Sequence, residues 1–369
     1  MQVLFFFLSF LTIPGLSINP QLLQNCSSIS LSSGDTVVFG RNHDGNISNT
    51  LIVYNPAGIY KEGFEYPGEA VPKWKSKYAS ITFGGLGAGF AILGMNEAGL
   101  AIGHMGFSEA KYPPKDDRPV IDQIQFIAYL LDNCENTEEV ITGAEKIRID
   151  DESITREHYF VCDKKGEKAI LEFIEGKLVV YTTANMPYPL ISNDSYEKSL
   201  KYLEAYSGFG GEKPVPEKVF GVEEIMAIGC RGIQKFNSEK GSGVIESAFS
   251  ILHDIGFNKY PPPDSIEVPE NYGTQFTVVF DLKNLKVYFK TKSDFSVREI
   301  DFAYFNNDCK EGLKVLEIEE TTGGKVNSRF RAYTKSGNHS FVRRMLNGSG
   351  LPEEVITFLA DYPETFKCD

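Results

Sequence analysis

The sequence predicts an α+β protein in which antiparallel sheets are layered with helices. Short apolar segments are joined by tight turns, as between residues 27 and 39, and this arrangement is typical of strand hairpins. Segments with helical periodicity come in groups between the strands. Since strands and helices do not alternate one by one, the pattern favours antiparallel sheets over a doubly wound parallel sheet.

Strands and helices are assigned from these two periodicities, and turns from polar and glycine-containing breaks. The expected strands are residues 27–31, 36–39, 51–54, 79–83, 89–93, 100–102, 159–162, 169–173, 178–181, 276–281 and 286–290. Hairpin turns are expected at residues 32–35, 96–99 and 282–285. The expected helices are residues 121–131, 137–146, 197–206, 222–228 and 245–255.

The remaining segments give weaker signals. Three consecutive prolines at 261–263 mark a surface loop, and the tail after Cys309 is charged and only weakly periodic. The sequence contains no internal repeat and no clear interdomain linker. Residues 26–369 are therefore expected to form a single domain with a C-terminal tail.

Composition excludes several classes of protein. The chain has 369 residues, 42% of them hydrophobic, and a formal net charge of -13. That negative balance argues against a general nucleic-acid or anionic-membrane binder. The longest apolar run is too short to span a bilayer, so no membrane-spanning segment is expected.

The N-terminal segment has the pattern of a secretory leader. Residues 3–13 are almost entirely apolar and are followed by a turn and small residues up to Ser17. We expect residues 1–17 to be a signal peptide, residues 18–25 a short pro-segment, and the protein to follow the secretory route. A buried N-terminal strand is the alternative.

Cysteines and histidines show no metal-binding pattern. The six cysteines are widely spaced, without CxxC, and the histidines show no HExxH spacing, so no metal or cofactor is expected. Cys309 and Cys368 are candidates for a bridge to the tail, which the sequence leaves open. Five Asn-x-Ser sequons begin at Asn25, Asn46, Asn193, Asn338 and Asn347.

Candidate catalytic groups cluster around Cys26. This cysteine opens the first strand directly after the removable segment, and Arg41 and Asp44 are expected just past the end of its hairpin partner. The hairpin brings the two ends together, so a thiol, a guanidinium and a carboxylate meet. A nearby guanidinium favours the nucleophilic thiolate. Once Cys26 is N-terminal, its own α-amine, with a reference pKa of about 8, is a suitable general base that Asp44 can orient.

The ordered set of motifs resembles the choloylglycine hydrolase family, which includes bile salt hydrolases and penicillin V acylases. The set comprises Cys26, the segment GRNHDG at 40–45, GMNEAGLAIG at 94–103, TTANMPYP at 182–189 and GTQFTVVFDLKNLKVYFKT at 273–291. The resemblance covers residues 26 to about 301. It implies the N-terminal-nucleophile (Ntn) hydrolase fold, a four-layer αββα sandwich of two antiparallel sheets.

The resemblance also implies roles for individual residues. Cys26 would be the nucleophile, with Arg41 and Asp44 beside it. The backbone N–H of Asn96 and the side-chain amide of Asn185 would bind the oxyanion. Arg231 would be a further catalytic-site residue, although the sequence around it, GCRGI, departs from the family pattern.

The expected function is hydrolysis of a linear carboxamide in a small N-acyl substrate, through a thioester on Cys26. An acyltransferase on the same scaffold and a non-catalytic secreted binding protein are the alternatives. Homo-oligomerisation is left open.

Each site residue also has a structural interpretation. Cys26 also fits a buried structural cysteine or a lipidated cysteine. Arg41 and Asp44 also fit an ion pair on the surface. Asn96 and Asn185 also fit as turn residues.

Overall fold

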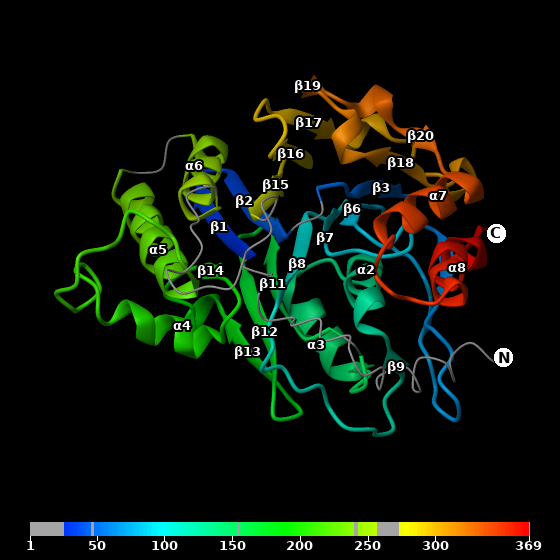
Figure 1. Ribbon diagram of the computed structural model, residues 1–369, viewed down its shortest axis with the longest axis horizontal. Helices are drawn as coiled ribbons and strands as arrows, with labels where there is room; N and C mark the ends of the chain where they lie inside the picture. The colour runs from blue at the N-terminus through cyan, green and yellow to red at the C-terminus, as the bar shows by residue number, and fades with distance from the viewer. Residues whose placement is uncertain (1–25, 46–47, 154, 240–242, 257–272, 369) are drawn as a thin grey trace.

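The computed structural model describes residues 26–45, 48–153, 155–239, 243–256 and 273–368 (Figure 1). Two large sheets pack face to face, and helices cover their outer faces. The expected four-layer αββα sandwich is confirmed. The expected signal peptide, the pro-segment and the three prolines at 261–263 lie outside the described residues.

The first sheet has seven strands within the described residues and carries the N-terminal hairpin. Its order is β14 (Leu190–Ile191), β1 (Ser27–Ser33), β2 (Thr36–Gly45), β15 (Gly273–Asp281), β16 (Lys286–Thr291), β17 (Arg298–Asp301) and β19 (Gly324–Lys325). Neighbouring strands are antiparallel except β17 and β19. The β1–β2 and β15–β16 hairpins confirm two of the expected turns. We call this the seven-stranded sheet.

The second sheet has nine strands within the described residues and is antiparallel throughout. Its order is β13 (Lys177–Thr182), β12 (Lys168–Ile174), β11 (Glu157–Asp163), β8 (Leu100–Gly106), β7 (Leu93–Asn96), β6 (Ser80–Gly84), β3 (Leu51–Asn55), β18 (Lys314–Glu317) and β20 (Arg331–Ala332). The β7–β8 connection confirms the expected turn at 96–99. We call this the nine-stranded sheet.

Two small sheets flank the sandwich. Parallel strands β9 (Val120–Ile121) and β10 (Arg148–Ile149) form one, and β4 (Ile59–Glu62), β5 (Lys73–Lys75) and β21 (Lys367–Cys368) form the other.

The core between the two large sheets is rich in phenylalanine. Phe39, Phe276 and Phe280 from the seven-stranded sheet face Phe83 and Phe160 from the nine-stranded sheet, and all five side chains are fully buried. Ring centroids of Phe39 and Phe160 lie 5.6 Å apart across the interface. Alternation along the strands places apolar residues on this face, and burial of such large rings dominates the energy of sheet packing.

Helices cover both outer faces. Those over the seven-stranded sheet are α4 (Tyr196–Leu203), α5 (Val222–Ser238) and α6 (Val244–Gly256), and those over the nine-stranded sheet are α2 (Gln123–Asn133) and α3 (Thr137–Lys146). None of the helices within the described ranges combines the length and the apolar character needed to traverse a bilayer.

Helix α5 is longer than the sequence predicts. The expected helix ended at residue 228, before Gly229 and Gly232, whereas α5 continues to Ser238. A Cβ on Gly229 would lie 2.2 Å from Leu190 Cδ1, and one on Gly232 would lie 2.8 Å from Ile251 Cγ1. The glycines therefore do not end the helix; they allow it to pack closely on β14 and α6.

Two other expectations about strands are corrected. Strand β2 runs to Gly45, so Arg41 and Asp44 lie inside it and not beyond its end, because β15 pairs along the full length of that segment. The strand expected at 89–93 is β7, which begins only at Leu93. The preceding glycines form a close-packed loop, in which a Cβ on Gly89 would lie 2.4 Å from the Tyr362 ring.

The C-terminal tail is ordered, although its periodicity is weak. It adds β18 and β20 to the nine-stranded sheet and contributes helices α7 (Lys335–Met345) and α8 (Glu353–Asp361). These helices pack on Phe90 and Phe64 in a separate apolar cluster. A disulfide joins Cys309 to Cys368, as the sequence allowed.

Candidate active site

Cys26 lies at the start of β1, between the two large sheets. Its residue is 3% exposed and belongs to the core between the sheets. The backbone N–H of Asp44 donates to Cys26 Sγ at 3.5 Å, and the Ser192 hydroxyl donates to the Cys26 carbonyl oxygen at 2.8 Å. The sulfur is thus held from β2 and the backbone from the end of β14.

Arg41 reaches the same place from β2 and is only 2% exposed. Its side chain crosses Gly103 of β8, where a Cβ would lie 3.2 Å from Arg41 Cδ. Burial lowers the pKa of the guanidinium, while the neighbouring Cys26 sulfur and Glu157 carboxylate oppose that shift. A buried cation beside a thiol favours the thiolate.

Asp44 contributes both backbone and side chain. Its residue is 2% exposed, and its Oδ1 accepts a hydrogen bond of 2.6 Å from the Thr274 hydroxyl. A shift in register between Thr274 and Phe276 of β15 accompanies this contact. The structure therefore brings Cys26, Arg41 and Asp44 together at one end of the sandwich, as the hairpin argument predicts.

Two residues outside the predicted set of site residues lie at the same end. Ser192 follows β14 directly, and Asn193 Nδ2 donates to the Gly106 carbonyl at the end of β8 over 2.7 Å. From the sequence, Asn193 is noted only as the first residue of a glycosylation sequon. The apolar pair of β14 was the available signal, because a strand that pairs antiparallel with β1 carries its next residues to the Cys26 end.

A second ionisable pair borders Arg41. Glu157, which opens β11, is 2% exposed, and its Oε2 lies 2.7 Å from His104 Nδ1. Burial lowers the pKa of His43 well below its ordinary value, and Arg41 and His104 add to that shift. His43 stacks on Phe276 with centroids 4.7 Å apart. The His43 imidazole is therefore neutral and stacked beside the site.

Asn96 lies at the opposite end of the sandwich. It ends β7, whereas the Cys26 end is marked by Gly106 and Glu157, which pair where β8 ends and β11 begins. Beside Asn96, a Cβ on Gly99 would contact the Leu282 carbonyl in the β15–β16 turn. This turn lies at the same end as the β1–β2 turn, because β15 and β2 are antiparallel. The oxyanion role predicted for Asn96 has no support in this geometry.

Asn185 and Arg231 are not brought to Cys26 either. Asn185 follows β13, is exposed, and its Oδ1 accepts from the Thr182 backbone N–H at 2.6 Å. Thr182 pairs with Ala169, near the end of the nine-stranded sheet that carries Asn96. Arg231 lies on the exposed surface of α5, whose opposite side packs on β14.

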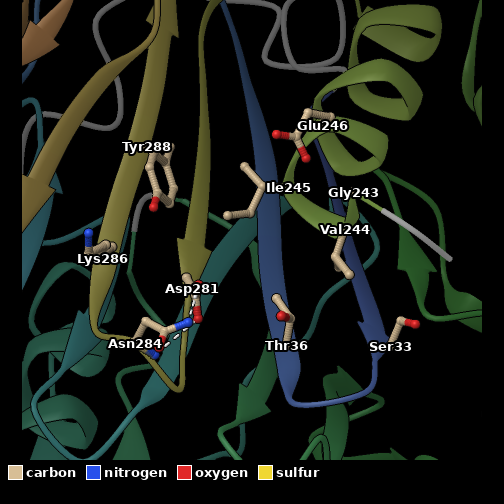
Figure 2. Close-up of a pocket in the computed structure, with 10 residues that line it drawn as sticks. All are labelled: Ser33, Thr36, Gly243, Val244, Ile245, Glu246, Asp281, Asn284, Lys286 and Tyr288. Atoms are coloured by element: carbon tan, nitrogen blue, oxygen red, sulfur yellow. Dashed lines mark hydrogen bonds between the residues drawn. The ribbon is translucent and has the colours of Figure 1, made fainter.

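A cavity of about 620 Å³ lies at the hairpin-turn end of the seven-stranded sheet (Figure 2). Ser33 and Thr36 flank it from the β1–β2 turn, and Asp281 accepts from Asn284 on its other side. Because β1 runs away from Cys26 toward this turn, the cavity is separate from the candidate active site.

Comparison with known proteins gives a consistent result. The sequence model described as linear amide C–N hydrolases, choloylglycine hydrolase family, matches residues 26–234, more than half of the chain. The penicillin V acylase of Pectobacterium atrosepticum is 23% identical over 263 residues, which cover 63% of this chain and 69% of the relative.

Solved structures share the fold. Penicillin V acylase from Agrobacterium tumefaciens superposes with a TM-score of 0.69 at 24% identity, covering 84% of this chain and 98% of that one. A cysteine-to-alanine mutant of the conjugated bile acid hydrolase from Clostridium perfringens gives a TM-score of 0.65 at 19% identity, covering 81% and 98%.

The two-sheet sandwich agrees with the Ntn-hydrolase fold of these neighbours, and the family match extends over more than half of the sequence. The chain therefore belongs to the choloylglycine hydrolase family and is a hydrolase of linear amide carbon–nitrogen bonds.

Proposed function

We propose that Cys26, as the N-terminal residue of the mature protein, is the nucleophile that cleaves a small N-acyl amide. The observation that carries the proposal is the surroundings of its sulfur. The thiol lies beside the buried Arg41 guanidinium and accepts from the Asp44 backbone N–H at 3.5 Å. Both groups stabilise a thiolate, which is the nucleophilic form.

Maturation would expose the α-amine that this chemistry needs. We propose that residues 1–17 are removed as a signal peptide on the secretory route and that residues 18–25 are then cleaved. Two observations support this order. The family match begins at Cys26, and the Cys309–Cys368 disulfide fits an oxidising compartment.

The proposed reaction has two steps. Cys26 sulfur attacks the amide carbonyl carbon and forms a carbon–sulfur bond. The carbon–nitrogen bond then breaks, and the amine leaves with a proton from the Cys26 α-amine. Water next attacks the thioester, which releases the carboxylic acid and returns the thiol.

We propose that the side-chain amide of Asn193 donates a hydrogen bond to the oxyanion. Its amide lies at the Cys26 end and donates to the Gly106 carbonyl, a contact that a bound substrate would compete with. A preorganised donor that meets charge only in the transition state contributes about 3 kcal/mol. Asn185, in contrast, is exposed at the other end of the sandwich.

Intact-mass analysis tests the proposal. The secreted protein should have the mass of a chain beginning at Cys26, and mixing with penicillin V or a conjugated bile acid followed by acid quenching should add one acyl group. Cys26→Ala should add none and show no hydrolysis. Cys230→Ala is the matched control, because burial raises the pKa of that thiol and makes it inert. Full activity in a mature chain that retains residues 18–25 would contradict the free-amine mechanism.

A further inference from the structure

A buried histidine–glutamate pair lies behind the residues that hold Cys26. His158 of β11 and Glu172 of β12 are both 0% exposed. His158 Nδ1 lies 3.1 Å from Glu172 Oε1, and its Nε2 lies 2.6 Å from the Ser192 carbonyl oxygen. The ring also stacks on Phe107 with centroids 4.9 Å apart. Both ring nitrogens and one ring face are therefore engaged.

The partners of the imidazole fix its protonation pattern. A carbonyl oxygen only accepts, so Nε2 must carry a hydrogen that it donates to Ser192. The Nδ1–Oε1 contact then requires one proton between the two atoms. Glu172 Oε1 also accepts from the Tyr196 backbone N–H at 2.8 Å. The pair thus has a hydrogen bond of fixed direction at each end, one to the Ser192 carbonyl and one from the Tyr196 N–H. It links the start of α4 to the end of β14.

The segment that His158 holds is the segment that touches Cys26. Ser192 uses its hydroxyl to contact the Cys26 carbonyl oxygen at 2.8 Å, and the next residue, Asn193, donates to Gly106. Three consecutive contacts therefore run from Glu172 through His158 and Ser192 to Cys26. Neither ionisable side chain contacts the Cys26 sulfur in the described hydrogen bonds.

We propose that the His158–Glu172 pair is a positioning device for the reaction. It holds the Ser192 carbonyl and thereby keeps Ser192 and Asn193 in the arrangement that the attack on the amide requires. This inference rests on the proposed role of Cys26. A buried histidine–carboxylate pair adds little net stability compared with apolar side chains of the same size, since desolvation offsets its attraction. Its contribution here is to fix the orientation of the Ser192 carbonyl.

The double variant His158→Phe, Glu172→Leu separates positioning from stability. Two apolar side chains fill a similar volume and leave no buried charge unpaired, so the variant should fold. Its melting temperature should fall by several degrees, because the buried Ser192 carbonyl and Tyr196 N–H lose their partners. The Ser192 carbonyl loses its donor, and the rate of acyl-enzyme formation in a single turnover should fall on the order of 100-fold. Affinity for penicillin V should change by less than about 3-fold, because the pair does not touch the substrate.

Two further variants complete the test. Glu172→Gln can still accept from Tyr196 and hydrogen-bond Nδ1, so it should keep most of the acylation rate. His339→Phe removes a more exposed histidine–carboxylate pair, whose Nε2–Oδ1 distance to Asp361 is 2.7 Å, and should leave that rate unchanged. Should the double variant not fold, His158→Phe alone makes the same distinction, since it also removes the donor of the Ser192 carbonyl while Glu172 keeps its contact with the Tyr196 N–H.

The outcomes are distinguishable. A folded double variant, or a folded His158→Phe variant, that acylates at the wild-type rate overturns the positioning role. A rate loss explained entirely by the unfolded fraction, read from the melting curves, also overturns it. If wild-type protein itself forms no acyl-enzyme, the proposed role of Cys26 fails instead.

Discussion

The two ends of the sandwich contain polar side chains in opposite situations. At the end that carries Asn96, every group of that amide is used: Nδ2 donates to the Leu131 and Cys134 carbonyls, and Oδ1 accepts from Ala98 and Leu100. At the Cys26 end, Arg41 Nε and Nη1 have no hydrogen-bond partner among the described residues, although both atoms are buried.

This difference teaches how to separate a structural polar residue from a reactive one. A buried group whose hydrogen bonds are complete stabilises the fold around it, whereas buried donors with unused capacity need an explanation. At the Cys26 end, the explanation that we propose is a substrate or transition state. Removing one group at a time from each end tests this distinction.

Arg41→Ala should give the largest effect. Without the buried guanidinium the thiolate forms less readily, so turnover should fall on the order of 10³-fold and alkylation of Cys26 should shift to higher pH. Iodoacetamide labelling across a pH series measures this. Arg231→Ala, on the exposed surface of α5, is the matched control and should keep wild-type turnover. Identical labelling profiles for Arg41→Ala and wild type would rule out the tuning role of Arg41.

The two asparagines Asn193 and Asn185 form a second contrast. Asn193→Ala should lower kcat on the order of 100-fold, because it removes the proposed oxyanion donor. Asn185→Ala should stay within about 2-fold of wild type, since surface changes away from a site have small effects. Steady-state kinetics on one substrate decides between them. The reverse order of effects would restore the assignment that the family resemblance implied.

Asn96→Ala should change stability and leave chemistry alone. Four backbone groups would lose their partner at a fully buried position, which costs about 3 kcal/mol of unfolding free energy. Urea denaturation measures that loss, and the folded fraction should retain wild-type kcat. A drop in kcat with an unchanged unfolding free energy would return Asn96 to the catalytic residues.

Sequence patterns predicted the fold well because they report local periodicity. The β1–β2 hairpin, the turn at 96–99 and helix α3 lie where the two periodicities and the polar breaks place them. The sequence periodicity ends helix α5 too early, at residue 228, whereas Gly229 and Gly232 provide close packing that only the assembled fold reveals.

The part of the candidate site that could be predicted is the part formed by a single hairpin. Cys26, Arg41 and Asp44 belong to the same pair of strands, so their meeting follows from antiparallel pairing. Asn193 and His158 arrive from other strands, and their place depends on which strand lies beside β1. Asn96 and Asn185 have motif-like surroundings, but strand direction carries them to the far end.

The Cys309–Cys368 bridge has a practical consequence for handling the protein. In the chain-entropy account, closing a loop with a sequence separation of 59 stabilises the fold by about 4 kcal/mol. The proposed nucleophile requires reduced sulfur, whereas this bridge requires oxidised sulfur. A strong dithiol added to protect Cys26 would also open the bridge that ties β21 and the end of the chain to the body of the protein. Gentle monothiol conditions, with the bridge monitored by mass, suit both sulfur chemistries in one polypeptide.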